Sequence, residues 1–506
     1  MANRGTVEMK IVILSVPRIA PVRPSAGVSM LKALCVRQGV DNRVLDLNQD
    51  FFMRFAREHS EVSKRIDEYW IQFQTQLSAA DQIMYHAWID HWVDQILSQN
   101  SNIIGISVFS WQSQRFTRDL LERLRPEYSG EILIGGQGLV NSQNMSSHWS
   151  PACGFAEDLK AEGLIDYWLK GESEETFPKF LRGERVLPGL NNNEIVTLAD
   201  MDSAPYMDFS DHDIAAYQNG YQDGVLPVES SRGCVRSCSF CEMSSDHGAF
   251  RGKSGIALAK EIIYYYETTN CRNYYFHDDL INGDLQELRR FISHILDYYH
   301  ENNLPDHYFT FSGYWIVRSS RQWSEADFET WYRAGGNTMV TGVETGSDRL
   351  RKTMRKGFTN RDLEFTLRCL DKFRMKFYFM LIAGLPGETQ EDFQATLDAL
   401  TRWQRYVASG VIIGVNLGTT ATIEPGTDIY NRPEHYNLVG LRGKRPQGIN
   451  WMCTTTPGLD YRERVRRRVV LQEHVTNLRY PLWKGDDHLS IILDKYKEHL
   501  EVWEDR

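Results

Sequence analysis

The stretch Ser231-Arg232-Gly233-Cys234-Val235-Arg236-Ser237-Cys238-Ser239-Phe240-Cys241 holds three of the eight cysteines of the chain within eight residues. Thiolates four and three residues apart can converge from one loop on a soft metal. Three protein ligands, rather than four, leave one coordination position open for another molecule. The stretch therefore predicts a metal centre at which chemistry takes place, and it fixes where the rest of the fold must bring its binding groups.

Length and composition describe an ordinary folded protein. The chain has 506 residues, of which 42% are hydrophobic and 25% charged, as in globular proteins of two or three domains. It has no apolar run of about eighteen residues, and its first residues do not resemble a signal peptide, so we expect a cytoplasmic protein with no membrane partner. A net charge of -10 argues against nucleic acid as the main partner.

The N-terminal part alternates short apolar runs with helical patterns. The expected strands are 10–15, 40–47, 102–110 and 131–136, and the expected helices are 30–37 and 113–125. This order predicts an α/β domain over 1–195, with a Rossmann-like, doubly wound sheet. Residues 49–100 interrupt it as a helical insert with aromatic residues at helical spacing. We favour a packed core for these aromatics over a role in stacking on a substrate.

Residues 196–223 lose periodicity and gather Asp, Pro, Gly and Tyr, which predicts a linker. Six strands alternating with helices then predict a partial (β/α)6, TIM-like barrel over 224–430. The expected strands are 225–229, 274–277, 308–312, 338–343, 376–382 and 411–417, and the expected helices are 255–269, 285–299, 325–334, 360–374 and 391–406. Residues 431–506 are expected to form a small, mostly helical C-terminal extension.

Polar and glycine-rich segments follow these barrel strands, at the sheet edge where ligands gather in parallel α/β folds. The cysteine stretch follows the first strand, and Asp278 and Asp279 follow the second. The later segments are Trp315 to Arg318, Thr341-Gly342-Val343-Glu344-Thr345-Gly346-Ser347 and Gly384-Leu385-Pro386-Gly387-Glu388-Thr389. Carboxylates suit an ammonium group or ribose hydroxyls, and an Arg fork suits a carboxylate.

Cys-x3-Cys-x2-Cys at the first strand of such a barrel resembles the radical S-adenosylmethionine (SAM) superfamily. The segments 276–279, 342–347 and 384–389 resemble its branch with an N-terminal B12-binding-like (cobalamin-binding) domain. The resemblance implies that Cys234, Cys238 and Cys241 hold one [4Fe-4S] cluster. It also implies an enzyme that cleaves SAM reductively to a 5'-deoxyadenosyl radical and modifies an unactivated centre of its substrate.

By motif position, the resemblance implies SAM contacts for eight residues. Phe240 would lie near the adenine, Asp278 and Asp279 near the amino group, Arg318 near the carboxylate and Glu344 near the ribose. Gly342, Ser347 and Leu385 complete this set. The expected partners are an organic substrate, either a small molecule or a peptide, and an electron donor such as flavodoxin or ferredoxin.

Cobalamin would lie against Ser107, Ser110, Gly135 and Gly136 of the N-terminal domain, and would favour methyl transfer. The Asp-x-His-x-x-Gly pattern that supplies an axial histidine in many cobalamin proteins is absent from that domain. The alternative is a cobalamin-free epimerase, dehydrogenase, rearrangement or C-C bond-forming enzyme that tailors peptides or natural products.

Other interpretations remain beside this one. A zinc site would need a fourth ligand such as Glu242 or His247, and would suit a non-catalytic, metal-stabilised binding protein. The N-terminal half offers only Cys35 and Cys153, too few for the second cluster of the methylthiolating branch. Beyond residue 400 the chain has only Cys453, too few for an auxiliary C-terminal cluster. Cys453 is either a hydrogen-atom donor to a substrate radical or, as we favour, a buried thiol.

The C-terminal run Tyr461-Arg462-Glu463-Arg464-Val465-Arg466-Arg467-Arg468 is strongly basic and has a helical pattern. It could bind phosphate, RNA or an acidic leader peptide. We favour a solvated helix face with internal Glu pairing, because the chain as a whole is acidic.

Overall fold

The computed structural model describes residues 9–17, 22–71, 75–139, 154–217, 223–243, 248–440, 443–456, 458–482 and 493. Two compact units make up the chain: Met1–Pro227 with Thr269–Asn273, and Val228–Thr268 with Tyr274–Arg506. Each unit is described by itself. Among the described residues, no helix is both long and apolar enough to cross a membrane.

The first unit contains a parallel sheet of five strands in the order β2-β1-β3-β4-β5. Its strands are β1 Lys10–Ser15, β2 Asp41–Asp46, β3 Ile103–Ser107, β4 Glu131–Gly135 and β5 Tyr167–Leu169. The order reverses between β1 and β3, which is the usual ligand edge of a doubly wound sheet. This confirms the predicted Rossmann-like fold, to which β5 is an addition.

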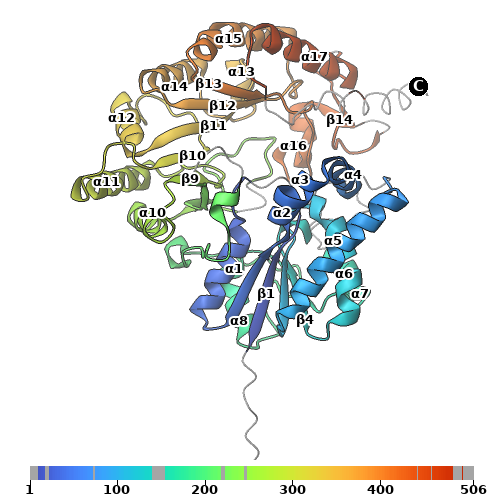
Figure 1. Ribbon diagram of the computed structural model, residues 1–506. Coiled ribbons are helices and arrows are strands. Elements are labelled where there is room, and N and C mark those ends of the chain that lie inside the picture. The colour runs from blue at the N-terminus through green and yellow to red at the C-terminus, as the bar shows by residue number, and fades with distance from the viewer. Residues whose placement is uncertain are drawn as a thin grey trace, which may run out of the picture. The chain divides into compact units, whose positions relative to one another are not determined.

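Helices cover both faces of this sheet, which explains why its central strands read as continuous apolar runs. The helices are α1 Ala26–Arg37, α6 Gln114–Leu124, α7 Gly154–Ala161 and α8 Ser173–Leu181. Figure 1 shows α1 and α8 on one side of the sheet and α6 and α7 on the other. Residues 11–14 of β1 are fully buried between the two layers.

Between β2 and β3 lies the helical insert. It comprises α2 Leu47–Asp50, a π-helical turn Phe51–Phe55, α3 Ala56–Glu58, α4 Ser60–Ile71 and α5 Ala79–Ser98. Its buried aromatic side chains are Phe51, Phe55, Trp70, Tyr85 and Trp88, against which Phe52, Tyr69 and Trp92 pack, and Phe73 lies outside the described residues. The indole N–H of Trp70 donates to the Tyr85 hydroxyl (2.9 Å), which donates to Asp119 (2.8 Å). The aromatic stripe therefore packs as core with its polar atoms paired.

The segment that we predicted as a linker is bound to the first unit by buried polar contacts. The Asp211 carboxylate accepts hydrogen bonds from Lys32 Nζ (2.7 Å), Arg43 Nη1 (2.7 Å) and the Val44 N–H (2.8 Å). The Tyr217 hydroxyl donates to Asp46 at the end of β2 (2.5 Å). Its described residues are therefore part of the first unit and not a free connection.

We expect Asp211→Asn to lower the free energy of unfolding of the first unit by about 3 kcal/mol, because it leaves the buried ammonium of Lys32 without its carboxylate. Urea denaturation followed by tryptophan fluorescence measures the change. Asp208→Asn is the matched control, since the Asp208 carboxylate accepts a local hydrogen bond from Ser210 N–H. Equal midpoints for the two variants would contradict the anchoring role of Asp211.

A six-stranded sheet in the order β13-β12-β11-β10-β9-β6 belongs to the second unit, apart from Leu226, Pro227 and Asn273 in its last two strands, which are assigned to the first unit. Its strands are β6 Leu226–Val228, β9 Asn273–Phe276, β10 Thr310–Tyr314, β11 Gly336–Glu344, β12 Lys376–Leu381 and β13 Ile412–Asn416. A helix follows each of the first five, namely α10 Gly255–Thr269, α11 Leu285–Glu301, α12 Glu325–Ala334, α14 Asn360–Lys372 and α15 Gln390–Ala408. Figure 1 shows these helices along the outer face of the curved sheet, which confirms the predicted partial barrel.

Local sequence fixes where three of these helices begin. Ser324, Thr359 and Thr389 each cap a helix, and the Asp three residues later returns a hydrogen bond to the capping residue. Each reciprocal pair satisfies backbone N–H groups that the first helical turn leaves unpaired. The loops between the strand ends and these caps are thereby held in place.

The C-terminal extension has a short helix, a hairpin and a long helix. These are α16 Asp428–Asn431, the antiparallel strands β14 Leu438–Gly440 and β15 Trp451–Cys453, and α17 Tyr461–Asn477. Residues 483–492 and 494–506 lie outside the described residues.

The basic run in α17 shows the expected internal Glu pairing, since Glu463 pairs with Arg466 and Arg467, but it is not simply a solvated face, because three of its arginines are buried. Arg464 donates to the carbonyls of Trp451 (2.9 Å) and Ile449 (2.6 Å), and its guanidinium lies over the Trp451 ring. Arg467 pairs with the buried Glu388 carboxylate (2.9 Å), and Arg468 donates to the Gly418 carbonyl. Guanidinium groups can be buried when backbone carbonyls accept hydrogen bonds from their N–H groups. This face of α17 therefore holds the extension to the barrel.

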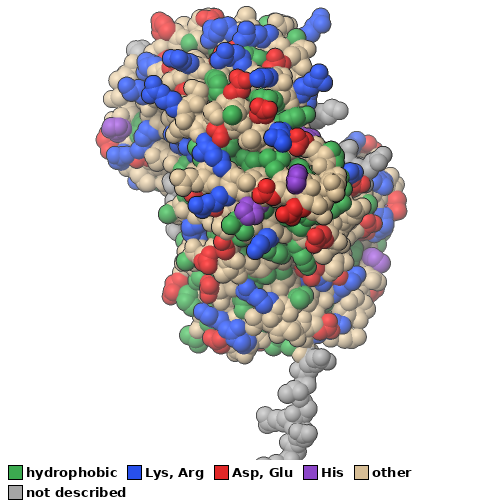
Figure 2. Space-filling view, turned by 90° about the vertical axis from the view of Figure 1, so that its left-hand side faces the viewer, with side chains coloured by type: hydrophobic (Ala, Val, Ile, Leu, Met, Phe, Trp, Pro, Cys, Tyr) green, Lys and Arg blue, Asp and Glu red, His purple; other side chains and the backbone are tan. Residues whose placement is uncertain are grey.

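The surface carries charges of both signs. On the face drawn in Figure 2, Lys and Arg side chains alternate with Asp and Glu over both units, with no broad stripe of one sign. In α17, the exposed Arg466 is paired with Glu463.

Candidate functional site

The cysteine loop connects the two short strands β7 Ser231–Arg232 and β8 Arg251–Gly252, which pair antiparallel. Gly233 has φ +77, and a Cβ there would lie 3.1 Å from the Gly248 carbonyl oxygen, so the turn into the loop requires glycine. The Cys241 N–H donates to the Cys238 carbonyl (3.2 Å) and closes the turn that carries the last two cysteines.

Neighbouring segments hold this loop from two sides through Ser239, which is fully buried. The Ser239 N–H donates to the Met354 carbonyl (3.1 Å), and the Ser239 carbonyl accepts from the Ile429 N–H (3.0 Å). Met354 follows the short helix α13 Asp348–Thr353, and Ile429 lies in α16. The barrel and the C-terminal extension therefore both fix the loop.

Cys234, Cys238 and Cys241 are free, half-buried thiols. Burial raises the pKa of all three, that of Cys241 to about 11, and the charges of Cys238 and Cys234 raise the pKa of Cys241 further. In the described part of the chain, no three His, Cys, Asp or Glu side chains, these thiols included, are gathered into a metal-binding group. His247, one suggested zinc ligand, lies outside the described residues.

The number and chemistry of the thiol ligands nevertheless indicate which metal group the loop could hold. Three thiols on one short loop act electrostatically on one another, and no described carboxylate or imidazole completes a four-ligand group with them. Structural zinc requires such a closed set, whereas an iron–sulfur cluster accepts three thiolates and leaves one iron open. A loop with three thiols therefore fits a [4Fe-4S] cluster that keeps one iron open.

The two acids after β9 have different surroundings. Asp278 is buried, and its carboxylate accepts the Ser230 N–H (2.8 Å) and both the Ser230 and Ser231 hydroxyls. Burial raises the pKa of Asp278 well above its usual range. Asp279 is half-buried, and its charge acts on Cys234. Asp278 therefore holds the start of the cysteine loop, while Asp279 acts on Cys234 through its charge.

Two arginines lie near Cys234. The Arg318 Nη2 group donates to the Asn282 (2.6 Å) and Gly283 (3.1 Å) carbonyls, and burial together with the charge of Arg236 lowers the pKa of Arg318 to about 10. The Nε atoms of Arg318 and Arg236 are buried and have no hydrogen-bond partner among the described residues. Two guanidinium groups with unfilled donors form a site for a carboxylate.

The end of β11 carries the predicted acid. Glu344 has φ +66, and its carboxylate accepts a hydrogen bond from Lys356 Nζ (2.8 Å). A Cβ at Gly342 would lie 2.1 Å from Glu344 Oε1, so any larger residue there would displace the Glu344 carboxylate from its present position. Ser347 is instead structural, because its hydroxyl donates to Asp392 (2.5 Å) and caps α13.

Phe240 and Leu385 belong to one apolar surface. Leu385 is buried in a cluster formed with the C-terminal extension, and Phe240 packs against that cluster from the cysteine loop. Lys356 Nζ lies 5.6 Å from the centre of the Phe240 ring. An apolar face next to a cation and the cysteine loop suits an aromatic base.

Cys453 lies in the same apolar cluster, on β15. Burial by itself would raise its pKa, but hydrogen bonds from Thr455 and Thr456 lower it below the usual value. Thr455 and Thr456 also line a polar cavity of about 430 Å³, to which Arg349 and His435 contribute. The thiol is therefore buried and polarised, and its role as a hydrogen-atom donor stays a prediction.

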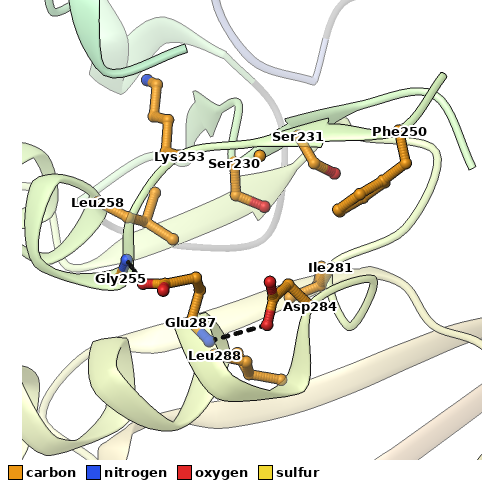
Figure 3. A pocket seen from close by; sticks show the side chains of 11 residues that line it. Ser230, Ser231, Phe250, Lys253, Gly255, Leu258, Ile281, Asp284, Glu287 and Leu288 are labelled. Carbon is orange, nitrogen blue, oxygen red and sulfur yellow. Dashed lines mark hydrogen bonds between the residues drawn. The ribbon is translucent and has the colours of Figure 1, made fainter. Parts of the chain in front are cut away.

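A small cavity lies at the base of the cysteine loop (Figure 3), with a volume of about 20 Å³, which is room for one water. Glu287 accepts from the Gly255 N–H (2.8 Å), and Lys253 points away from the cavity to pair with the buried Glu261. The region is a rigid support for the loop and not a substrate pocket.

In the first unit, Ser107, Ser110, Gly135 and Gly136 lie at the carboxyl ends of β3 and β4. Gly136 has φ +106, and a Cβ there would lie 2.5 Å from the Val108 carbonyl oxygen. The Ser110 hydroxyl is buried without a partner among the described residues, and a Cβ at Gly135 would meet only ordinary contacts. We call these small residues, with the unfilled Ser110 hydroxyl, the cradle; that it holds the tail of a cobalamin stays a prediction.

Two residues of the site were missed from the sequence. Lys356 and Arg236 both lie near the cysteines, yet neither stands at a strand end. Arg236 lies inside the cysteine motif, which is the signal that could have identified it.

Comparison with known proteins gives a family match and several relatives. Residues 228–400 match the Radical SAM superfamily model. A tRNA-2-methylthio-N(6)-dimethylallyladenosine synthase of Carboxydothermus hydrogenoformans is 42% identical over 69 residues, 13% of this chain and 15% of that protein. An uncharacterized methyltransferase of Pyrococcus horikoshii is 24% identical over 308 residues, 58% of this chain and 61% of that protein. The chain thus spans less than two thirds of either relative.

Two solved structures share the fold over most of the chain. The cobalamin-dependent S-adenosylmethionine radical enzyme OxsB, with aqua-cobalamin and S-adenosylmethionine bound, has a TM-score of 0.63 at 16% identity. The match covers 93% of this chain and 67% of that chain. The radical S-adenosylmethionine methyltransferase TsrM of Kitasatospora setae has a TM-score of 0.59 at 15% identity, over 95% and 90% of the two chains. Both units of the fold therefore occur together in known enzymes.

Proposed function

Starting from a chain that carries a radical SAM domain and shares the fold of cobalamin-dependent radical SAM enzymes, we propose a SAM-dependent enzyme with one [4Fe-4S] cluster. The single observation that carries this proposal is the convergence on the cysteine loop of groups suited to an amino acid. Asp279, Arg236 and Lys356 all act on Cys234. The cluster would supply one electron, by which bound SAM is cleaved to a 5'-deoxyadenosyl radical.

The residues of the second unit divide the binding of SAM among them. Asp279 takes the ammonium group, and Arg318 with Arg236 takes the carboxylate. Glu344 accepts the ribose hydroxyls beside Gly342. Phe240 and Leu385 offer the adenine an apolar face. Asp278 and Ser347, placed in this set by motif position, act by holding the backbone.

Methyl transfer assisted by cobalamin is the leading chemistry. The cradle of Ser107, Ser110, Gly135 and Gly136 supports it, as does the shared fold with OxsB and TsrM, both of which have been solved with cobalamin bound. Methyl transfer to an unactivated centre then requires both cofactors. Similarity to the methylthiolating enzymes covers a small part of the chain, and the cysteines for their second cluster are absent.

Cobalamin-free radical chemistry is the second candidate, and the polarised Cys453 favours it. A thiol with hydrogen bonds from Thr455 and Thr456 could return a hydrogen atom to a substrate radical. The substrate in either case is an organic molecule or peptide, and a flavodoxin- or ferredoxin-class protein supplies electrons. Unpaired thiols and an oxygen-sensitive cluster suit a reducing, cytoplasmic location.

Anaerobic reconstitution tests the proposal. We expect about four irons per chain and, with SAM and a low-potential reductant, formation of 5'-deoxyadenosine. Protein produced with cobalamin should retain a corrinoid spectrum and release S-adenosylhomocysteine on methyl transfer. Zinc in place of iron, with no nucleoside product, would contradict the proposal.

A further inference from the structure

Lys356 is a buried cation beside the cysteine loop that no motif position identifies. Its side chain is 15% exposed and that of its partner Glu344 is 10% exposed, with 2.8 Å between Nζ and Oε1. Burying an ammonium group costs several kcal/mol, so it is found in protein interiors only where paired charge offsets that cost. The burial of this ion pair therefore needs a reason other than the ordinary distribution of charges on a protein surface.

The turn that carries Lys356 is tied to the cysteine loop at each of its four residues, 354–357. The Met354 carbonyl accepts from Ser239, and the Arg355 carbonyl lies 3.9 Å from Cys238 Sγ. Lys356 lies over the Phe240 ring, and a Cβ at Gly357 would clash with the Arg236 guanidinium. The position of the ammonium group is thus fixed relative to the three thiols.

The backbone conformation of this turn is unusual, and it helps to place Lys356 beside the cysteine loop. Arg355 has φ +57 and Gly357 has φ +76, so residues on both sides of Lys356 are left-handed. A non-glycine residue in that region costs about 1 kcal/mol or more and persists only where surrounding contacts fix it. Glu344, the partner, is left-handed as well. Two strained segments together bring the cation to the loop.

The charge of Lys356 acts on more of the three cysteines than the charge of Glu344 does. Its positive charge acts on Cys234, Cys238 and Cys241, whereas the negative charge of Glu344 acts on Cys238. A one-electron reduction makes a bound cluster one unit more negative. A nearby fixed cation stabilises that extra charge, and a nearby carboxylate opposes it.

We propose that Lys356 is a positioning residue which, held by Glu344, keeps a fixed positive charge beside the three cluster thiolates and favours one-electron reduction of the cluster. The electron comes from a low-potential donor of the flavodoxin or ferredoxin class, which is oxidised by one electron. This inference rests on the proposed function, because it requires the [4Fe-4S] cluster.

The test is an EPR-monitored redox titration of the reconstituted protein without SAM, so that SAM binding cannot influence the result. We expect Lys356→Met to shift the midpoint potential to more negative values. At the wild-type midpoint, its ratio of reduced to oxidised cluster should fall about tenfold. Lys356→Arg should keep the wild-type midpoint potential, because it keeps the positive charge. Glu344→Gln keeps an oxygen that can accept the hydrogen bond from Lys356 but removes a negative charge, so it should shift the potential in the opposite, positive direction, which general damage to the loop would not do.

Lys352→Met is the matched control, since Lys352 is an exposed lysine four residues earlier on α13. A fully loaded Lys356→Met protein with the wild-type potential would overturn the inference while leaving the proposed function intact. If Lys356→Met fails to load a cluster, Glu344→Gln decides: a positive shift supports the inference and an unchanged potential overturns it. Wild-type protein that holds no iron would remove both the proposed function and this inference.

Discussion

Cys238→Ala is expected to bind less than about one tenth of the wild-type iron after anaerobic reconstitution, and to form no 5'-deoxyadenosine. Three thiolates are the smallest set that holds a [4Fe-4S] cluster with an open iron, so the loss of one removes the cluster. The loop itself should survive, because Ser239 and not Cys238 anchors it to Met354 and Ile429. Iron analysis and liquid chromatography of the nucleoside measure the two effects.

Cys369→Ala is the control for this experiment. Cys369 is buried in α14, and its substitution removes a thiol without touching the cysteine loop. It should retain wild-type iron. A Cys238→Ala protein that keeps full iron loading, or a Cys369→Ala protein that loses it, would contradict the assignment of the ligands.

Gly135→Leu is expected to lower retention of corrinoid by at least about tenfold in protein produced with cobalamin. A Cβ at Gly135 would be 3.6 Å from the Leu169 carbonyl oxygen, an ordinary contact, so a larger side chain fits the backbone but fills the cradle. Gly136 is unsuitable for this test, since its φ of +106 makes any side chain strained there. The visible spectrum of the purified protein reports the bound corrinoid.

Gln99→Leu is the control for the cradle. Gln99 is half-buried at the end of α5, which precedes the amino end of β3 and so lies at the opposite edge of the sheet. It should leave corrinoid binding unchanged. Equal corrinoid content in Gly135→Leu and wild type would contradict the location of the cofactor, and no corrinoid in wild type would favour the cobalamin-free candidate.

Much of the fold could be predicted because its strands are short apolar runs separated by helical patterns. All six barrel strands were expected within a few residues of their observed bounds. β5 was missed because only three residues, Tyr167–Leu169, form it. The polar segment around Asp211 was expected to be a linker, since its composition does not show that Lys32 and Arg43 are its partners.

Position at a strand end predicted the neighbourhood of the site but not the use of each side chain. Asp278 and Asp279 are adjacent in sequence, yet the first is buried against Ser230 and the second lies near Cys234. Lys356 could not be predicted, because its closeness to the cysteines depends on how the turn after α13 packs on the loop. Such contacts are set by tertiary structure alone.

The arginines of α17 show a limit of charge patterning. Their sequence suggested a solvated or anion-binding face, whereas Arg464, Arg467 and Arg468 are buried. Backbone carbonyls and the Glu388 carboxylate accept hydrogen bonds from these arginines. Acceptors of this kind cannot be recognised from the sequence of the helix itself.

The central claim is that the three-thiolate cluster keeps one iron open for SAM. EPR spectroscopy of the reduced, reconstituted protein with and without SAM tests it most directly. We expect a [4Fe-4S] signal that changes on addition of SAM, because the amino and carboxylate groups of SAM bind the open iron. A cluster spectrum that SAM leaves unchanged, or protein that holds zinc and gives no cluster signal, would contradict it.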